Sequence, residues 1–211
     1  MINKPTISHF FYKKLGPILF FMLWMGCAND PKTTATPMIA SPDSIHIGDS
    51  EVEIKRIRKD GLDIALTSKK DRLMSELQVD IKDSTQSKQY TTKLQLDGQI
   101  QDVHVTDLNN DGLKEVYIFN TSSGSGSYGD VIGYQLGKSG LDTILFSSAD
   151  ANADENYMGH DSFYIKYPYL YRKYPKYREI DPNCCPTGGT RNIAYKLIKQ
   201  RGRLILKQTK L

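Results

Sequence analysis

The sequence predicts an all-β fold, an antiparallel β-sandwich or barrel with at most one short helix. From about residue 46 onward, short stretches of alternating apolar and polar residues recur between turn signals, which is typical of consecutive strands. The predicted strands are residues 52–57, 77–82, 94–96, 103–105 and 116–119. No long segment shows a convincing helical period, and the best helical candidate, Lys69 to Glu76, is short.

Two hairpins are predicted in the second half of the chain. Each consists of two strand-like runs around a short glycine-containing turn: residues 131–136 and 141–146 around GKSG at 137–140, and residues 193–198 and 204–207 around QRG at 200–202. Short connections of this kind join antiparallel neighbours, which favours a sandwich or barrel.

Residues 1–26 predict an export signal rather than a part of the fold. Lys13 and Lys14 supply positive charge, and the apolar run 15–25 is too short to span a bilayer comfortably. Gly26 and Cys27 end this run, an arrangement that resembles the bacterial lipoprotein signal. The resemblance implies cleavage before Cys27 and lipidation of that cysteine, which would anchor the protein to a membrane. An ordinary cleaved signal or a retained anchor is the alternative.

The expected organisation after the signal is a lipidated N-terminus and flexible tether at 27–45, followed by a single β domain at 46–211. Residues 28–45 are rich in Thr, Pro, Ala and Ser and show no apolar period. Ala28 follows the cysteine, where the resemblance associates aspartate with the inner membrane, so we expect the outer membrane, facing the periplasm or the cell surface.

Net charge gives no support for a nucleic-acid partner. Removing residues 1–26 takes away Lys4, Lys13 and Lys14, which leaves 25 of the 28 basic residues against 24 acidic ones. The mature chain therefore carries a net charge of only +1.

Cys184 and Cys185 are the two cysteines that follow Cys27. Cα atoms of adjacent residues lie about 3.8 Å apart, whereas disulfides usually need more than about 4.4 Å. The pair therefore predicts two mostly buried thiols or a strained vicinal bridge, and stability must come from a hydrophobic core.

Residues 107–115 (DLNNDGLKE) have the spacing of a cation-binding loop. Asp107, Asn109, Asp111 and Glu115 offer oxygen atoms at alternating positions, and Gly112 allows the chain to reverse. Ile118 stands where an EF-hand has its bidentate acid, so the loop instead resembles calcium loops between β-strands, which usually come in arrays. The alternative is an Asp-Gly turn in which Asp107 and Asn109 cap their own backbone. No other cofactor is indicated.

Catalytic residues are not predicted. His46, His104 and His160 lie far apart, and nothing nominates one of them as a base for Cys184 or Cys185. The acidic residues that could pair for glycoside chemistry lie in a polar stretch that favours a solvated loop: Asp150, Asp154, Glu155 and Asp161.

Residues 157–178 combine tyrosines with basic residues. Tyr167, Tyr169 and Tyr171 alternate and are expected on one face of a strand. Such a face most often packs as half-buried core, but it could also stack sugars or bases or form a protein interface.

Residues 122–130 (SSGSGSYGD) place one large aromatic residue among very small ones. The glycines make the backbone slim, and Ser125 and Tyr128 supply hydroxyl groups that can donate to carboxylates. The succession of strand, turn, strand and loop over residues 107–134 resembles the periplasmic inhibitors of invertebrate-type (I-type) lysozyme, which carry an S-G-x-Y motif on a protruding loop of a β-sandwich. Here the motif is Ser125-Gly126-Ser127-Tyr128.

The resemblance implies a non-catalytic, membrane-tethered inhibitor that inserts this loop into the active-site cleft of a lysozyme. By the motif match, Ser125, Gly126 and Tyr128 would form the partner-binding site. The alternative is a lipoprotein of the cell envelope that binds calcium through the Asp107–Glu115 loop or glycans through its tyrosine-rich face, without inhibitor activity.

Overall fold

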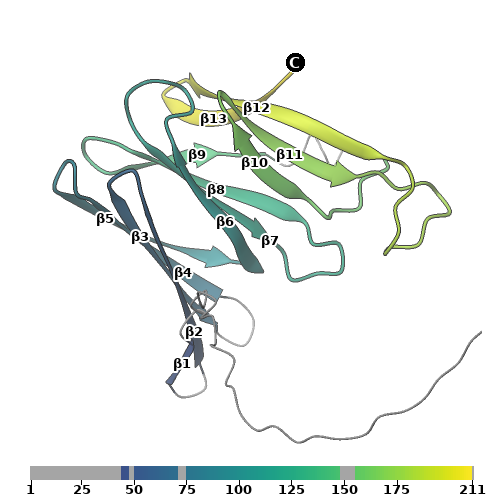
Figure 1. Ribbon diagram of the computed structural model, residues 1–211, viewed down its shortest axis with the longest axis horizontal. Helices are drawn as coiled ribbons and strands as arrows, with labels where there is room; N and C mark the ends of the chain where they lie inside the picture. Colours follow the sequence, from purple (N-terminus) through teal and green to yellow (C-terminus); the bar gives the residue numbers. More distant parts are fainter. Residues whose placement is uncertain (1–43, 48–49, 71–74, 148–154, 211) are drawn as a thin grey trace, which may run out of the picture. The chain divides into compact units, whose positions relative to one another are not determined.

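The computed structural model describes residues 44–47, 50–70, 75–147 and 155–210 (Figure 1). Contacts divide the chain into Met1–Ile39 and Ala40–Leu211, and every described residue belongs to the second unit. These residues form strands and no α-helix, which confirms the predicted all-β class, and they contain no helix able to cross a membrane. The predicted signal and Cys27 lie outside the described residues, and Ser44 and Ile45 of the predicted tether already belong to strand β1.

Five strands form the first sheet, a meander in which all neighbours are antiparallel. They are β1 (Ser44–Ile47), β2 (Ser50–Lys59), β3 (Leu62–Lys70), β4 (Ser75–Asp83) and β5 (Lys88–Leu96). Asp60 and Gly61 join β2 to β3 with φ angles of 50° and 77°, the conformation that Asp-Gly favours in two-residue hairpins.

The helical candidate at residues 69–76 is wrong. Lys69 and Lys70 end β3 and pair with Glu76 and Ser75 of β4. The pattern was too short to form a helix that competes with this hairpin, and residues 71–74 lie outside the described part of the chain.

Eight strands form the second sheet, in the order β10-β11-β12-β13-β9-β8-β7-β6. They are β6 (Gln99–Thr106), β7 (Glu115–Thr121), β8 (Gly129–Leu136), β9 (Leu141–Leu145), β10 (Ser162–Lys166), β11 (Tyr169–Pro175), β12 (Thr190–Gln200) and β13 (Arg203–Thr209). Neighbours are antiparallel except β13 and β9, which are parallel. Both predicted hairpins are present, as β8–β9 and β12–β13.

Strand β7 contributes to two hydrophobic cores. Val116 and Ile118 pack in a cluster with Leu, Ile and Val side chains of β3 and β4, so this core joins the two sheets. Tyr117 and Phe119 point to the opposite face and pack with residues of β8, β9 and β11–β13. Because side chains alternate along a strand, the uniformly apolar run at 116–119 serves both faces.

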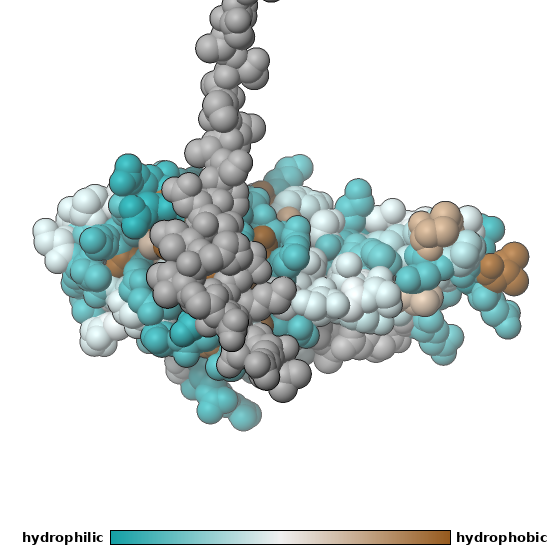
Figure 2. Space-filling model, turned by 90° about the horizontal axis from the view of Figure 1, so that it is seen from below, coloured by the Kyte–Doolittle hydropathy of each residue, from teal (hydrophilic) through white to brown (hydrophobic). Residues whose placement is uncertain are grey.

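The surface outside these cores is mostly polar. On the face seen in Figure 2, hydrophilic side chains predominate among the coloured residues, and hydrophobic ones form small separate groups. Apolar residues scattered in this way are ordinary on a protein surface.

Candidate functional site

The loop with the S-G-x-Y motif spans residues 122–128 and joins β7 to β8. Its base is closed because Thr121 pairs with Gly129, the Ser122 amide donates to the Tyr128 carbonyl oxygen at 2.8 Å, and the Tyr128 amide donates to Ser122 Oγ at 3.1 Å. At the tip, the Ser127 amide donates to the Gly124 carbonyl at 3.0 Å. Local hydrogen bonds therefore shape the loop as a narrow projection.

Ser125 and Tyr128 are exposed on this loop, as the motif predicted. Tyr128 leaves 49% of its surface accessible, although its ring packs edge-on against Tyr157 with centroids 5.6 Å apart. The Tyr157 ring packs in turn against buried Tyr174 at 4.8 Å. A row of aromatic contacts thus positions the Tyr128 ring while one part of it faces solvent.

Gly126 lies at two close approaches. A Cβ atom added there would lie 2.5 Å from the Tyr128 ring, which is closer than real Cβ contacts allow. The Gly126 carbonyl also accepts a hydrogen bond of 2.6 Å from the His160 amide. Gly159 precedes this amide with a φ of 86°, and a Cβ there would collide with the same carbonyl. Glycine at both positions lets the two segments meet backbone to backbone.

A buried ion pair supports the loop from behind. Asp161 Oδ1 accepts from Arg172 Nε at 2.6 Å, and neither side chain is accessible to solvent. Asp161 Oδ2 accepts from the Gly129 amide at 2.8 Å and from the Tyr157 hydroxyl at 2.6 Å. The Tyr157 hydroxyl also accepts from an Arg172 terminal nitrogen at 2.6 Å. The carboxylate thus connects the first residue of β8 to strand β11.

The electrostatics of this cluster favour the charged pair. Burial by itself lowers the pKa of Arg172, but the hydrogen bond and the charge of Asp161 raise it overall. Burial raises the pKa of Tyr157, and its hydrogen bond to Asp161 adds to that effect. The Arg172 guanidinium also lies 5.1 Å from the centroid of the Tyr157 ring. Arg172 therefore stays ionised and Tyr157 stays protonated at neutral pH.

Two expectations about this region are wrong. Asp161 does not lie in a solvated loop, because it is buried against Arg172, while Glu155 is exposed and Asp150 and Asp154 lie outside the described residues. Tyr167 does not share a strand face with Tyr169 and Tyr171, because it precedes β11 and is 60% exposed. One signal for the burial of Arg172 was present in the sequence, since Leu170, Arg172 and Tyr174 alternate on the inward face of β11.

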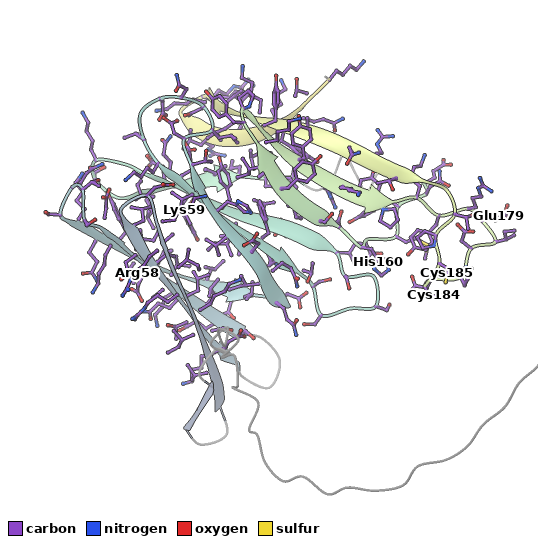
Figure 3. The ribbon with its side chains drawn as sticks, viewed as in Figure 1. Arg58, Lys59, His160, Glu179, Cys184 and Cys185 are labelled. Atoms are coloured by element: carbon purple, nitrogen blue, oxygen red, sulfur yellow. The ribbon has the colours of Figure 1, made fainter. Side chains whose placement is uncertain are left out.

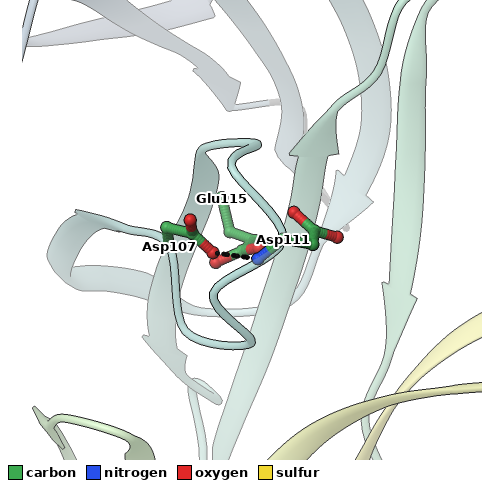
Figure 4. A group of neighbouring side chains, drawn as sticks. All are labelled: Asp107, Asp111 and Glu115. Carbon is green, nitrogen blue, oxygen red and sulfur yellow. Dashed lines mark hydrogen bonds between the residues drawn. The ribbon is translucent and has the colours of Figure 1, made fainter.

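The predicted cation loop brings together Asp107, Asp111 and Glu115, each of which offers one carboxylate oxygen within 4.8 Å of those of the other two (Figure 4). The predicted capping is present as well. Asp107 accepts from the Asp111 and Gly112 amides at 3.0 and 2.9 Å, and Asn109 Oδ1 accepts from the Asp111 amide at 3.2 Å. Oxygen ligands of this kind suit a hard cation, although several of the lone pairs are already used within the turn.

Glu115 is the buried member of this group. Its carboxylate accepts from the Leu108 amide at 2.6 Å and from Gln135 Nε2 at 3.2 Å. Burial, together with the charges of Asp107 and Asp111, raises the pKa of Glu115 to about 7. For Asp111, hydrogen bonds, first among them that from the Leu113 amide, overcome burial and lower its pKa.

The cysteine prediction needs correction. Cys184 and Cys185 are both exposed and unbridged within the described structure, not buried or joined. They lie in the β11–β12 connection, and Figure 3 shows them with His160 and Glu179 at one end of the domain. Turn residues around the pair hold it at the surface, which the adjacency of two cysteines does not reveal.

The remaining predicted groups are dispersed. Within the described residues, His104 pairs with Asp102 at 2.9 Å, and His160 contacts the Tyr177 ring at 6.2 Å between centroids.

An open pocket of about 720 Å³ lies at the ends of the β2–β3 and β4–β5 hairpins, where Arg58 and Lys59 are found (Figure 3). None of the predicted site residues lines this pocket.

Comparison with known proteins identifies a family for one segment. Residues 82–159 match the family model described as PliI, periplasmic lysozyme inhibitor of I-type lysozyme. No curated protein and no solved structure matches the chain. The matched segment includes both the 107–115 and the 122–128 loops but ends before Asp161 and Arg172. The family matched over residues 82–159 is the one predicted from the loop motif, the periplasmic inhibitors of I-type lysozyme.

Proposed function

We propose that this protein inhibits lysozyme by inserting the loop 122–128 into the active-site cleft of the enzyme. The family match supports a periplasmic lysozyme inhibitor. The observation that carries the finer proposal is the geometry of the loop, in which Ser125 and Tyr128 are exposed while Gly126 and the base are held from behind. Preorganisation of this kind lowers the conformational entropy lost on binding.

The chemistry of the target suits these two hydroxyl groups. Glycoside hydrolases use two carboxyl groups in a groove, and hydroxyl donors that bond to them exclude the substrate. Hydrogen bonds to charged acceptors contribute about 1.5 to 3 kcal/mol each. The protein therefore blocks the active-site cleft of the enzyme and needs no catalytic residue of its own.

The same proposal includes attachment to the membrane. Lipidation at Cys27 would tether the domain in the cell envelope, with the outer membrane facing the periplasm or the cell surface as the expected site. Mass spectrometry of the protein from a membrane fraction tests this part. A diacyl or triacyl group on Cys27 supports it, and an unmodified cysteine or an uncleaved signal contradicts it.

The inhibition test titrates residual lysozyme activity with the purified mature protein, using I-type, chicken-type and goose-type enzymes in parallel. We expect Tyr128→Ala and Ser125→Ala each to weaken inhibition of the I-type enzyme by at least about tenfold, equivalent to about 1.4 kcal/mol. Tyr167→Ala and Ser139→Ala are the matched controls, because both residues are exposed on other loops. Full inhibition by both loop variants would reject the insertion mechanism.

A calcium-binding protein of the envelope is the second candidate, favoured by the carboxylate group at Asp107, Asp111 and Glu115. Thermal unfolding with calcium and with a chelator tests it, because a ligand that binds only the folded state raises the melting temperature. A rise of several degrees with calcium that is lost in Asp107→Ala supports this function. Identical melting curves with calcium and with chelator contradict it.

A further inference from the structure

Cys184 and Cys185 form a second chemical feature, outside the segment that matches the inhibitor family. They lie in the loop 176–189, between β11 and β12. Both are free thiols on the surface, at the end of the domain that also carries His160 (Figure 3). Two nucleophilic groups are therefore open to reagents in solution.

Hydrogen bonds centred on Asp181 give this loop a defined conformation. The Asp181 carboxylate accepts from the Arg178 amide at 2.8 Å and from the Thr187 amide and hydroxyl, each at 2.7 Å. The Cys185 amide itself donates to the Pro182 carbonyl at 2.9 Å. Folding has therefore already ordered the loop that carries the two cysteines, so little further conformational entropy is lost when their side chains react together.

The two sulfur atoms interact with each other. A hydrogen bond with Cys184 raises the pKa of the Cys185 thiol. Since adjacent Cα atoms are about 3.8 Å apart, a bond between these sulfurs would be strained relative to disulfides in the usual range of about 4.4 to 6.8 Å. Strained, exposed disulfides are reduced more readily than structural ones, and they are the labile members of the class.

We propose that Cys184 and Cys185 form a reversible dithiol–disulfide site that exchanges with external disulfides. One protein thiolate attacks an external disulfide, whose sulfur–sulfur bond breaks and releases one thiol after protonation. The second cysteine then attacks the mixed disulfide and releases the other thiol. In total, two protein thiols and one external disulfide become one vicinal disulfide and two small thiols.

Contacts lead from this site to the motif loop. The Tyr177 hydroxyl donates to the Asn183 carbonyl at 2.8 Å, directly before the cysteine pair. The Tyr177 ring contacts that of His160, whose amide holds the Gly126 carbonyl. The redox site is thus part of the same end of the domain, but its chemistry does not depend on lysozyme binding.

The test uses the full mature protein, equilibrated first with oxidised and then with reduced glutathione, quenched with acid and alkylated with iodoacetamide. Trypsin releases residues 179–191, a peptide that contains both cysteines. We expect this peptide to lose two hydrogens and resist alkylation after oxidation, and to regain two alkylatable thiols after reduction. Cys184→Ser and Cys185→Ser should each stop at a mixed disulfide with one glutathione.

Three results would overturn the site: a peptide that carries two glutathiones, a disulfide between two protein molecules, or two thiols that stay alkylatable throughout. Unfolding curves of the serine variants check that the loop still folds. The readout is the peptide mass alone, so failure of this proposal is distinguishable from failure of the inhibition proposal.

Discussion

The two loops at the ends of β7 are stabilised in different ways. The loop before the strand, residues 107–115, is held by its own side chains, since Asp107, Asn109 and Asp111 all bond to backbone amides within the turn. The loop after the strand, residues 122–128, has few such side chains, and besides its own backbone hydrogen bonds it is held by His160 and by the Asp161–Arg172 pair, more than thirty residues away. A loop of small residues can be rigid when distant residues supply the bonds that its own side chains cannot make.

Removing the Asp161–Arg172 ion pair should have the largest effect on the stability of the protein. Arg172→Ala leaves the Asp161 carboxylate buried without its cation, so we expect the free energy of unfolding to fall by about 3 to 5 kcal/mol. Urea denaturation at neutral pH measures this. Arg203→Ala, at an exposed position of β13, is the control and should change stability by less than about 0.5 kcal/mol. A loss below about 1 kcal/mol for Arg172→Ala would show that the pair does not support the fold.

The acidic loop at residues 107–115 should make the free energy of unfolding depend on pH. In chelator, folded Glu115 has a pKa of about 7, raised from 4.5 by burial. The folded state then binds more protons than the unfolded state between these values, so the free energy of unfolding falls as pH rises from about 4.5 to about 7. The loss amounts to about 3 kcal/mol at most.

Denaturation curves at a series of pH values measure this slope. Glu115→Gln should flatten it, whereas Glu155→Gln, at an exposed site, should not. A bound cation would keep the carboxylate ionised, so calcium should also reduce the slope if the second candidate function is right. Parallel pH profiles for the parent and Glu115→Gln would contradict the burial argument.

The smallest expected effect comes from a glycine substitution in the motif loop. It separates the effect of the loop's shape on inhibition from its effect on stability. In Gly126→Ala the new Cβ would collide with the Tyr128 ring, which must move, so we expect inhibition to weaken by about tenfold and stability to fall by about 1 to 3 kcal/mol. Gly140→Ala, in the β8–β9 turn and outside the motif loop, is a matched control, because nothing lies within 4 Å of its Cβ position. Equal inhibition by the two variants would mean that the orientation of the Tyr128 ring is unimportant.

The same contrast explains what the sequence could predict. The capping by Asp107 and Asn109 uses neighbours in the chain, so the pattern DLNNDG was enough to expect it, and the hairpins at 131–146 and 193–207 were visible for the same reason. Asp60-Gly61 was an equally local hairpin signal that the prediction did not use.

The support of the motif loop was not predictable in this way. Arg172 lies on the inward face of β11, where a strand pattern calls for an apolar residue, and its partner Asp161 lies in a polar stretch that favours solvent. Their pairing depends on how the β10 and β11 strands and the segment around Gly129 meet in three dimensions. Exposure of Cys184 and Cys185 likewise depends on bonds of the surrounding loop.

Strand β7 also bears on the dynamics of the domain. Six consecutive residues from Glu115 to Asn120 are buried, and the strand pairs on both edges, with β6 and with β8. Amide hydrogens in such a position exchange with solvent only when most of the domain opens. Both candidate loops therefore begin or end on the segment whose amide hydrogens we expect to exchange most slowly, so their bases keep fixed positions in the folded domain.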